Sequence, residues 1–111
     1  LPQISLDQTK IRQALFNLLR NAQESIQHTH GKILFSASAV PDGVQITISD
    51  NGCGMTEDQI ENAFRPFVTY KPGGTGLGLA VTRQIIEAHQ GTLCVESTPK
   101  EGTSFYIFLP G

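Results

Sequence analysis

Apolar and polar residues alternate along several stretches of this chain, as they do in β-strands with one buried face. Two of these stretches are joined by Pro41-Asp42-Gly43, whose residue types are those of a tight hairpin turn. A pair near the C-terminus is separated by a second turn, Pro99-Lys100-Glu101-Gly102. The pattern predicts five strands, the first short and at a sheet edge, over residues 4–6, 33–40, 44–49, 92–97 and 103–109.

Other stretches have the spacing of amphipathic helices. The first runs from Asp7, a good N-cap, to a predicted stop near Gly31. A short second helix begins at Thr56, and a third covers residues 77–89 with apolar residues on two sides. The apolar stripe of the first helix comprises Ile11, Ala14, Leu15, Leu18, Leu19, Ala22 and Ile26.

The order of these elements is β-α-β-β-α-loop-α-β-β, which predicts an α/β fold. A two-layer sandwich buries the apolar faces of these elements most economically, with a mixed sheet of about five strands and about three helices on one face. The 111 residues suffice for one domain, residues 1–111. The chain begins with Leu1 and lacks an initiator Met, so we expect an excised domain.

Composition narrows the function classes. The net charge of −2, without a run of Lys or Arg, argues against a general nucleic-acid binder. Cys53 and Cys94 have no metal-ligand spacing; a disulfide between them stays open, and a reducing cytosol suits the pattern at least as well. No apolar run reaches membrane-spanning length, and we expect no direct membrane contact by this domain.

Glycines concentrate in the middle of the chain, six of the eleven lying between Gly52 and Gly78. The first cluster follows Asp50, at the point where a strand gives way to a loop. The second precedes the third helix, whose free N–H groups and positive dipole end suit a phosphate. Neither a Walker A loop nor a dinucleotide fingerprint fits, because the required Gly-Lys-Ser/Thr and third glycine are missing. The alternative is an ordinary surface loop.

Two asparagines, Asn17 and Asn21, lie one turn apart beside the apolar stripe of the first helix. They are either boundary amides or a polar site at the edge of the core, where an amide oxygen can ligate Mg²⁺. Lys71 stands beside the second glycine cluster. It is either an ordinary solvated lysine or a phosphate contact, and its position favours the contact.

Together these motifs resemble sensor histidine kinases. In chain order, the runs similar to that family's N box, first glycine box, F box, second glycine box and closing strand are 17–22, 50–55, 64–67, 74–80 and 102–105. The resemblance covers nearly the whole chain and implies the catalytic ATP-binding domain of such a kinase. That domain has the Bergerat fold, shared with gyrase, mismatch-repair and heat-shock chaperone ATPases. The short link at 68–73 most resembles the compact ATP lid of nitrogen-regulation-type kinases.

The resemblance implies roles for individual residues around ATP. Asp50 would accept a hydrogen bond from the adenine amino group, while Gly52 and Gly54 would let the base approach. Thr103 would lie near adenine through a water molecule, and Asn21 would hold Mg²⁺ that bridges the phosphates.

It also implies a phosphate site before the third helix. Gly74, Gly76 and Gly78 would form the lid hinge and phosphate cradle, and Lys71 would contact phosphate. The whole second glycine box is a candidate ATP-binding segment: Gly74, Thr75, Gly76, Leu77, Gly78 and Leu79.

Asn17 occupies the position where the ATPase relatives carry a catalytic Glu, and an amide cannot act as a general base. This favours phosphoryl transfer to a protein acceptor over hydrolysis. The candidate catalytic residues are therefore Asn17, Asn21 and Lys71.

None of His28, His30 or His89 has the sequence context of the family's phosphoacceptor. The implied partners are an upstream dimerisation and phosphoacceptor domain and a downstream response regulator. The implied location is the cytoplasm, either free or as the cytoplasmic part of a membrane-anchored sensor. Two alternatives stay open: an anti-sigma-factor-type serine kinase of this fold, and a module that binds nucleotide only to signal.

Overall fold

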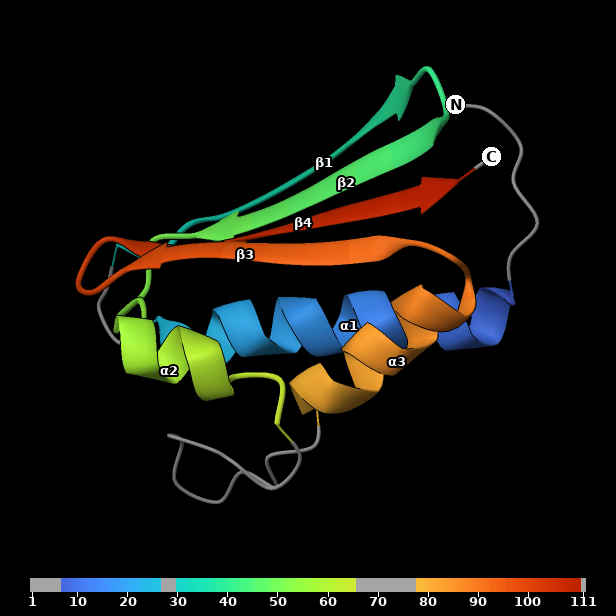
Figure 1. Cartoon of the computed structure of the whole chain (residues 1–111). Coiled ribbons are helices and arrows are strands. Elements are labelled where there is room, and N and C mark those ends of the chain that lie inside the picture. The colour runs from blue at the N-terminus through green and yellow to red at the C-terminus, as the bar shows by residue number, and fades with distance from the viewer. Residues whose placement is uncertain (1–6, 27–29, 66–77, 111) are drawn as a thin grey trace.

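The chain forms two layers, with a sheet on one side and helices on the other (Figure 1). The computed structural model describes residues 7–26, 30–65 and 78–110. Helices α1 and α3 lie beneath the sheet, and α2 lies near the turn between β3 and β4 (Figure 1). The elements are α1 (Gln8–Ser25), β1 (Ile33–Val40), β2 (Gly43–Asp50), α2 (Glu57–Asn62), α3 (Gly78–Ala88), β3 (Thr92–Thr98) and β4 (Gly102–Pro110).

The predicted two-layer α/β architecture is confirmed, with a difference in the sheet. Within the described ranges the sheet has four strands in the order β1-β2-β4-β3, and all three neighbouring pairs are antiparallel. We expected a mixed sheet of about five strands. Both sequential pairs are hairpins, which are antiparallel by geometry. The expected edge strand at residues 4–6 lies outside the described residues.

Helix α1 begins as predicted and ends earlier than predicted. Asp7 is the N-cap, and its side chain accepts a hydrogen bond from the Lys10 amide at 3.1 Å. The helix stops at Ser25, whereas we expected it to run to the neighbourhood of Gly31. The reason lies in the tertiary structure: the Ser25 carbonyl accepts the Cys53 N–H at 2.9 Å, so it is already paired with the loop after β2.

The core lies between the helices and the two central strands. The predicted stripe of α1 supplies Ile11, Ala14, Leu18 and Ala22. Ile85 and Ile86 are both buried on α3, which packs against α1 and against β3, so the prediction of two covered sides is confirmed. The sheet supplies Val44, Ile46, Ile48, Phe105, Ile107 and Leu109.

Strand β1 forms one edge of the sheet and contributes little to the core. Leu34 and Phe35 are 69% and 50% exposed, and Phe16 of α1 is also exposed. In the antiparallel register Phe35 lies opposite Ile48, so its side chain is on the helix-facing side of the sheet. The helices therefore cover β2, β4 and one face of β3 and leave β1 open.

In the part of the chain that the structure describes, no helix has the length and apolarity needed to cross a membrane.

Candidate functional site

Asp50 is the last residue of β2 and lies between the sheet and α1. It is only 9% exposed. Its Oδ1 atom accepts two hydrogen bonds, from the Ser25 hydroxyl at 3.0 Å and from the Gly52 N–H at 2.8 Å. Its Oδ2 atom is buried and has no hydrogen-bond partner among the described residues. A buried acceptor left without a donor costs about 1–3 kcal/mol, and more when it is charged. This atom is therefore a ready acceptor for a ligand donor.

Thr103 lies beside Asp50 across the sheet. The two residues are directly opposite in the antiparallel β2–β4 register, so their side chains share the helix-facing side. Thr103 is buried, and its hydroxyl pairs with the Ser97 hydroxyl at 2.8 Å. Ser97 also accepts the Met55 N–H at 2.8 Å, which fastens the loop after Asp50 to β3. The structure thus brings Asp50, Thr103 and the first glycine loop together.

Close packing and backbone conformation require the glycines of this loop. A Cβ on Gly52 would lie 2.3 Å from the Ser25 hydroxyl oxygen and 2.6 Å from its carbonyl oxygen. Gly54 has φ of +69°, which glycine adopts readily, and a Cβ there would lie 2.0 Å from the Thr98 carbonyl oxygen. These contacts are reasons for glycine within the protein itself. The role of Gly52 and Gly54 in letting adenine approach stays a prediction.

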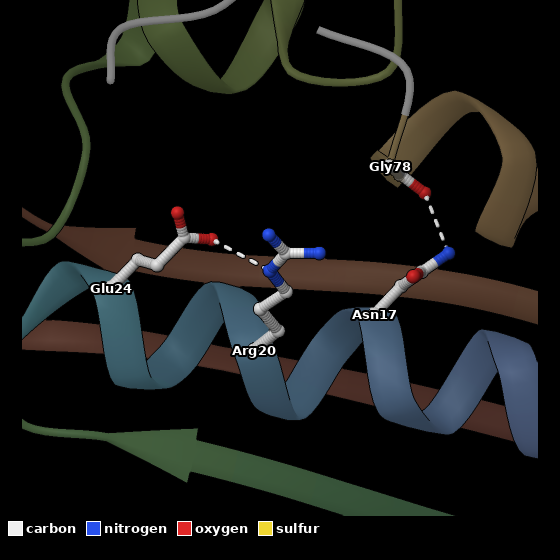
Figure 2. Close-up of polar contacts among 4 residues, drawn as sticks. All are labelled: Asn17, Arg20, Glu24 and Gly78. Carbon is white, nitrogen blue, oxygen red and sulfur yellow. Dashed lines mark hydrogen bonds and ion pairs between the residues drawn. The ribbon is translucent and has the colours of Figure 1, made fainter. Parts of the chain in front are cut away.

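Asn17 connects α1 to the start of α3. Its side-chain NH₂ group points to the Gly78 carbonyl oxygen at 3.5 Å, a long contact (Figure 2). The same carbonyl accepts a shorter hydrogen bond from the Thr82 hydroxyl at 2.7 Å. The N box and the start of α3, where the second glycine box ends, are therefore adjacent in space. Arg20, on the same side of α1 in this view, pairs with Glu24 at 3.9 Å, an exposed pair of small energetic value (Figure 2).

Asn21 lies on α1 one turn after Asn17 and one turn before Ser25. It is partly exposed, as a residue needs to be if its amide oxygen is to reach a bound metal. Among the described residues, no group of three or more His, Cys, Asp or Glu side chains could hold a metal ion. A metal at this site would need oxygen ligands from the nucleotide and from water in addition to the amide.

Comparison with known proteins identifies the family. Residues 6–111 match the family model described as histidine kinase-, DNA gyrase B- and HSP90-like ATPase. The chain belongs to this ATPase family. The match spans the N box, both glycine boxes and the closing strand, and the interpretation as a catalytic ATP-binding domain of the sensor histidine kinase type is confirmed.

Curated relatives are longer kinases. The chain is 43% identical to sporulation kinase B of Bacillus subtilis over 104 residues, covering 94% of the chain and 24% of the relative. It is also 43% identical to the sensor histidine kinase ZraS of Escherichia coli K12 over 110 residues, covering 99% of the chain and 23% of that relative. The chain thus spans about a quarter of the length of these relatives.

Solved structures agree with the fold. The catalytic domain of the histidine kinase ThkA, in a nucleotide-free form, superposes with a TM-score of 0.84 at 35% identity, covering 96% of this chain and 70% of that chain. Full-length ShkA, solved in complex with AMPPNP, superposes with a TM-score of 0.84 at 31% identity, covering 100% of this chain and 24% of that chain.

In this ATPase domain the F box is anchored to the core at Phe64. The Phe64 ring packs against the core, and the Arg83 guanidinium lies 5.4 Å from the ring centroid. Phe67, the other phenylalanine of the F box, lies outside the described residues.

Several predicted ATP-binding residues also lie outside the described residues: Lys71, Gly74, Thr75, Gly76 and Leu77. Of the rest of that segment, Leu79 is partly buried and packs against the core, which is the ordinary role of a leucine. A Cβ on Gly78 would meet no atom within 4 Å, so the described residues give no packing reason for glycine there. The two cysteines are free thiols, and the disulfide left open above is not formed.

Three residues of the site were missed by the sequence analysis: Ser25, Ser97 and Gly102. Ser25 and Ser97 hold Asp50 and Thr103, as described above. Gly102 has φ of +132°, and a Cβ there would lie 2.0 Å from the Asp50 carbonyl oxygen. Ser25 had a signal, since it lies four residues after Asn21 and therefore on the same helix face. Gly102 also had one, because it lies in the predicted turn before the last strand.

Proposed function

We propose that this domain binds Mg-ATP and transfers its γ-phosphoryl group to a histidine on a separate dimerisation domain, as part of two-component signalling. The observation that carries the proposal is the Asp50 carboxylate, with Oδ1 doubly hydrogen-bonded and Oδ2 buried without a partner among the described residues. The 6-amino group of adenine is a donor of the kind that Oδ2 lacks. The chain's relatives are sensor and sporulation kinases, which supports this choice of activity.

Base recognition would rest on the Asp50–Thr103 pair at the ends of two neighbouring strands. Oδ2 accepts from the adenine amino group, and Thr103 contacts the base through a water molecule. Because the acceptor is buried, competition from bulk water is weak and the hydrogen bond discriminates strongly among bases.

The metal and phosphate sites would lie beside α1 and the start of α3. The Asn21 amide oxygen is a suitable ligand for Mg²⁺, which takes one or two protein ligands together with phosphate oxygens and water. When bound, Mg²⁺ neutralises the charge that develops on the phosphates during transfer. Lys71 and residues 74–79 would cradle the phosphates, with free N–H groups at the start of α3 contributing.

In the transfer step a histidine nitrogen forms a bond to the γ-phosphorus atom, and the bond from that atom to the β,γ-bridging oxygen breaks, which releases ADP. Asn17 cannot remove a proton from water, and its NH₂ group already faces the Gly78 carbonyl. Transfer therefore depends on positioning of the acceptor rather than on an activated water.

The acceptor histidine would lie on a dimerisation domain in the same protein, upstream of this domain, and a response regulator would receive the phosphoryl group next. The curated relatives are about four times longer than the matched segment, which is consistent with such additional domains. With a net charge of −2 the domain would bind no nucleic acid. It would work in the cytoplasm without touching the membrane itself.

The experiment is phosphotransfer from γ-labelled ATP to an added histidine-bearing dimerisation domain. We expect label on that domain that is lost in acid and kept in base, and no transfer when Mg²⁺ is chelated. Label on a serine, stable in acid, would favour the serine-kinase alternative. ATP binding without transfer to any histidine- or serine-bearing partner would favour the signalling module.

A further inference from the structure

Ser25 lies at the C-terminal end of α1, 8% exposed, in direct contact with the Asp50 carboxylate. Its hydroxyl lies 3.0 Å from Asp50 Oδ1 and 2.9 Å from the Ala22 carbonyl oxygen. We propose that Ser25 is the positioning residue that sets base specificity, by fixing the orientation in which the Asp50 carboxylate is presented to the purine. This inference rests on the proposed binding of ATP and names the group that orients its adenine acceptor.

The physical argument begins with the freedom of a carboxylate. Rotation about the Cβ–Cγ bond of an aspartate is broad and roughly two-fold, so nothing intrinsic distinguishes its two oxygens. Here two donors converge on the same oxygen, the Ser25 hydroxyl and the Gly52 N–H. Together they fix the plane of the carboxylate and leave Oδ2 as the acceptor without a protein donor among the described residues.

Removing the hydroxyl would leave the Gly52 N–H as the donor to Oδ1. The carboxylate could then rotate. Nucleotide binding would have to fix its orientation, and this entropic cost lowers the affinity without removing a contact to the ligand. The loss falls only on ligands that use the Asp50 acceptor. A purine without a 6-amino group gains nothing from the orientation of Asp50 and so loses nothing with it.

The backbone contacts of Ser25 make this separation testable. Its carbonyl accepts the Cys53 N–H at 2.9 Å, and Gly52 packs directly against it. These contacts persist when the side chain is shortened, so the glycine loop stays attached to α1. Asn21 lies one turn earlier on the same helix, about 6 Å along its axis. Ser25 therefore also holds the proposed metal ligand and the adenine acceptor in one rigid unit.

The test is Ser25→Ala in the 111-residue chain, with calorimetric titration of Mg-ATP and of the triphosphate of purine riboside, which lacks the 6-amino group. We expect the affinity for ATP to fall roughly three- to tenfold, the ratio that corresponds to fixing one freed side chain on binding. We expect the affinity for the analogue to change less than twofold. The ATP preference of the wild type would shrink accordingly, and Ser25→Thr, which keeps a hydroxyl, would restore it.

The matched control is Ser49→Ala. Ser49 precedes Asp50 on the other side of the sheet, where its hydroxyl pairs with the Ser104 hydroxyl at 2.8 Å, and its loss should leave both affinities unchanged. Melting curves check that each variant folds. If Ser25→Ala does not fold, Ser25→Cys, with a weak donor in place of the hydroxyl, carries the same expectation.

The outcomes separate this inference from the proposed function. A wild type without any preference for ATP over the analogue would remove the adenine role of Asp50, and the inference with it. A wild-type preference that survives in Ser25→Ala would overturn the inference and leave the proposed function standing. Equal losses for both ligands would make Ser25 a structural residue and would also overturn it.

Discussion

The sharpest prediction concerns Asp50→Asn, because the structure determines how the introduced amide must be oriented. Two donors, the Ser25 hydroxyl and the Gly52 N–H, converge on Oδ1. The amide oxygen must stay at that position, so the NH₂ group takes the place of Oδ2. The variant then presents a donor where the wild type presents an acceptor.

The expected magnitude follows from this exchange. Loss of a hydrogen bond to a charged group costs about 1.5–3 kcal/mol, or roughly ten- to a hundredfold in affinity for ATP. Two donors facing each other add to that loss. The base preference should also reverse toward inosine triphosphate, whose 6-oxo group accepts from the introduced NH₂. The fold should persist because both contacts to the Oδ1 position are kept.

Titration calorimetry with ATP and inosine triphosphate, in the presence of Mg²⁺, measures both effects, and circular dichroism checks the fold. Asp42→Asn is the matched control, since Asp42 is exposed in the turn between β1 and β2 and the same chemical change there should leave both affinities unaltered. The reasoning is refuted if Asp50→Asn binds ATP within twofold of the wild type, or if its ATP-to-inosine triphosphate ratio does not move.

Three further predictions concern the metal ligand, turnover and the loop. Asn21→Ala should make nucleotide binding insensitive to Mg²⁺ and stop phosphotransfer; transfer at the wild-type rate would leave Asn21 as a boundary amide. The domain alone should hydrolyse ATP very slowly, and Asn17→Glu should not make it an efficient ATPase. Phosphate release measures both, and rapid multiple turnover by the unmutated domain would indicate an ATPase instead. Gly54→Ala should lose about 2 kcal/mol of stability or more, lowering the melting temperature by roughly 8 °C or more, because of its positive φ and the Thr98 carbonyl. Gly78→Ala, which meets no atom within 4 Å, should melt within a few degrees of the wild type; equal melting of both variants would contradict the packing argument.

Local sequence determined the elements and several of their ends. The apolar side of each element can be predicted from the two-residue period along β2 and β4 and from the apolar stripe on α1. That side is the buried one. Asp7 and Thr56 cap their helices through bonds to residues three positions away, so their roles could be predicted from neighbours in the chain. The position of Asp50 at the end of a strand followed in the same way.

The arrangement of the site was decided by tertiary structure. Local pattern does not state that β4 lies next to β2, and that pairing is what places Thr103 opposite Asp50. The early end of α1 and the fixed orientation of the Asp50 carboxylate depend on Ser25 meeting the end of β2 and the loop after it, about 25 residues further along the chain. Short-range interactions follow the periodicity of each helix or strand and can therefore be recognised in the sequence. Contacts between distant segments depend on how whole elements pack, because many such packings bury the same apolar residues while only one brings these particular polar atoms together.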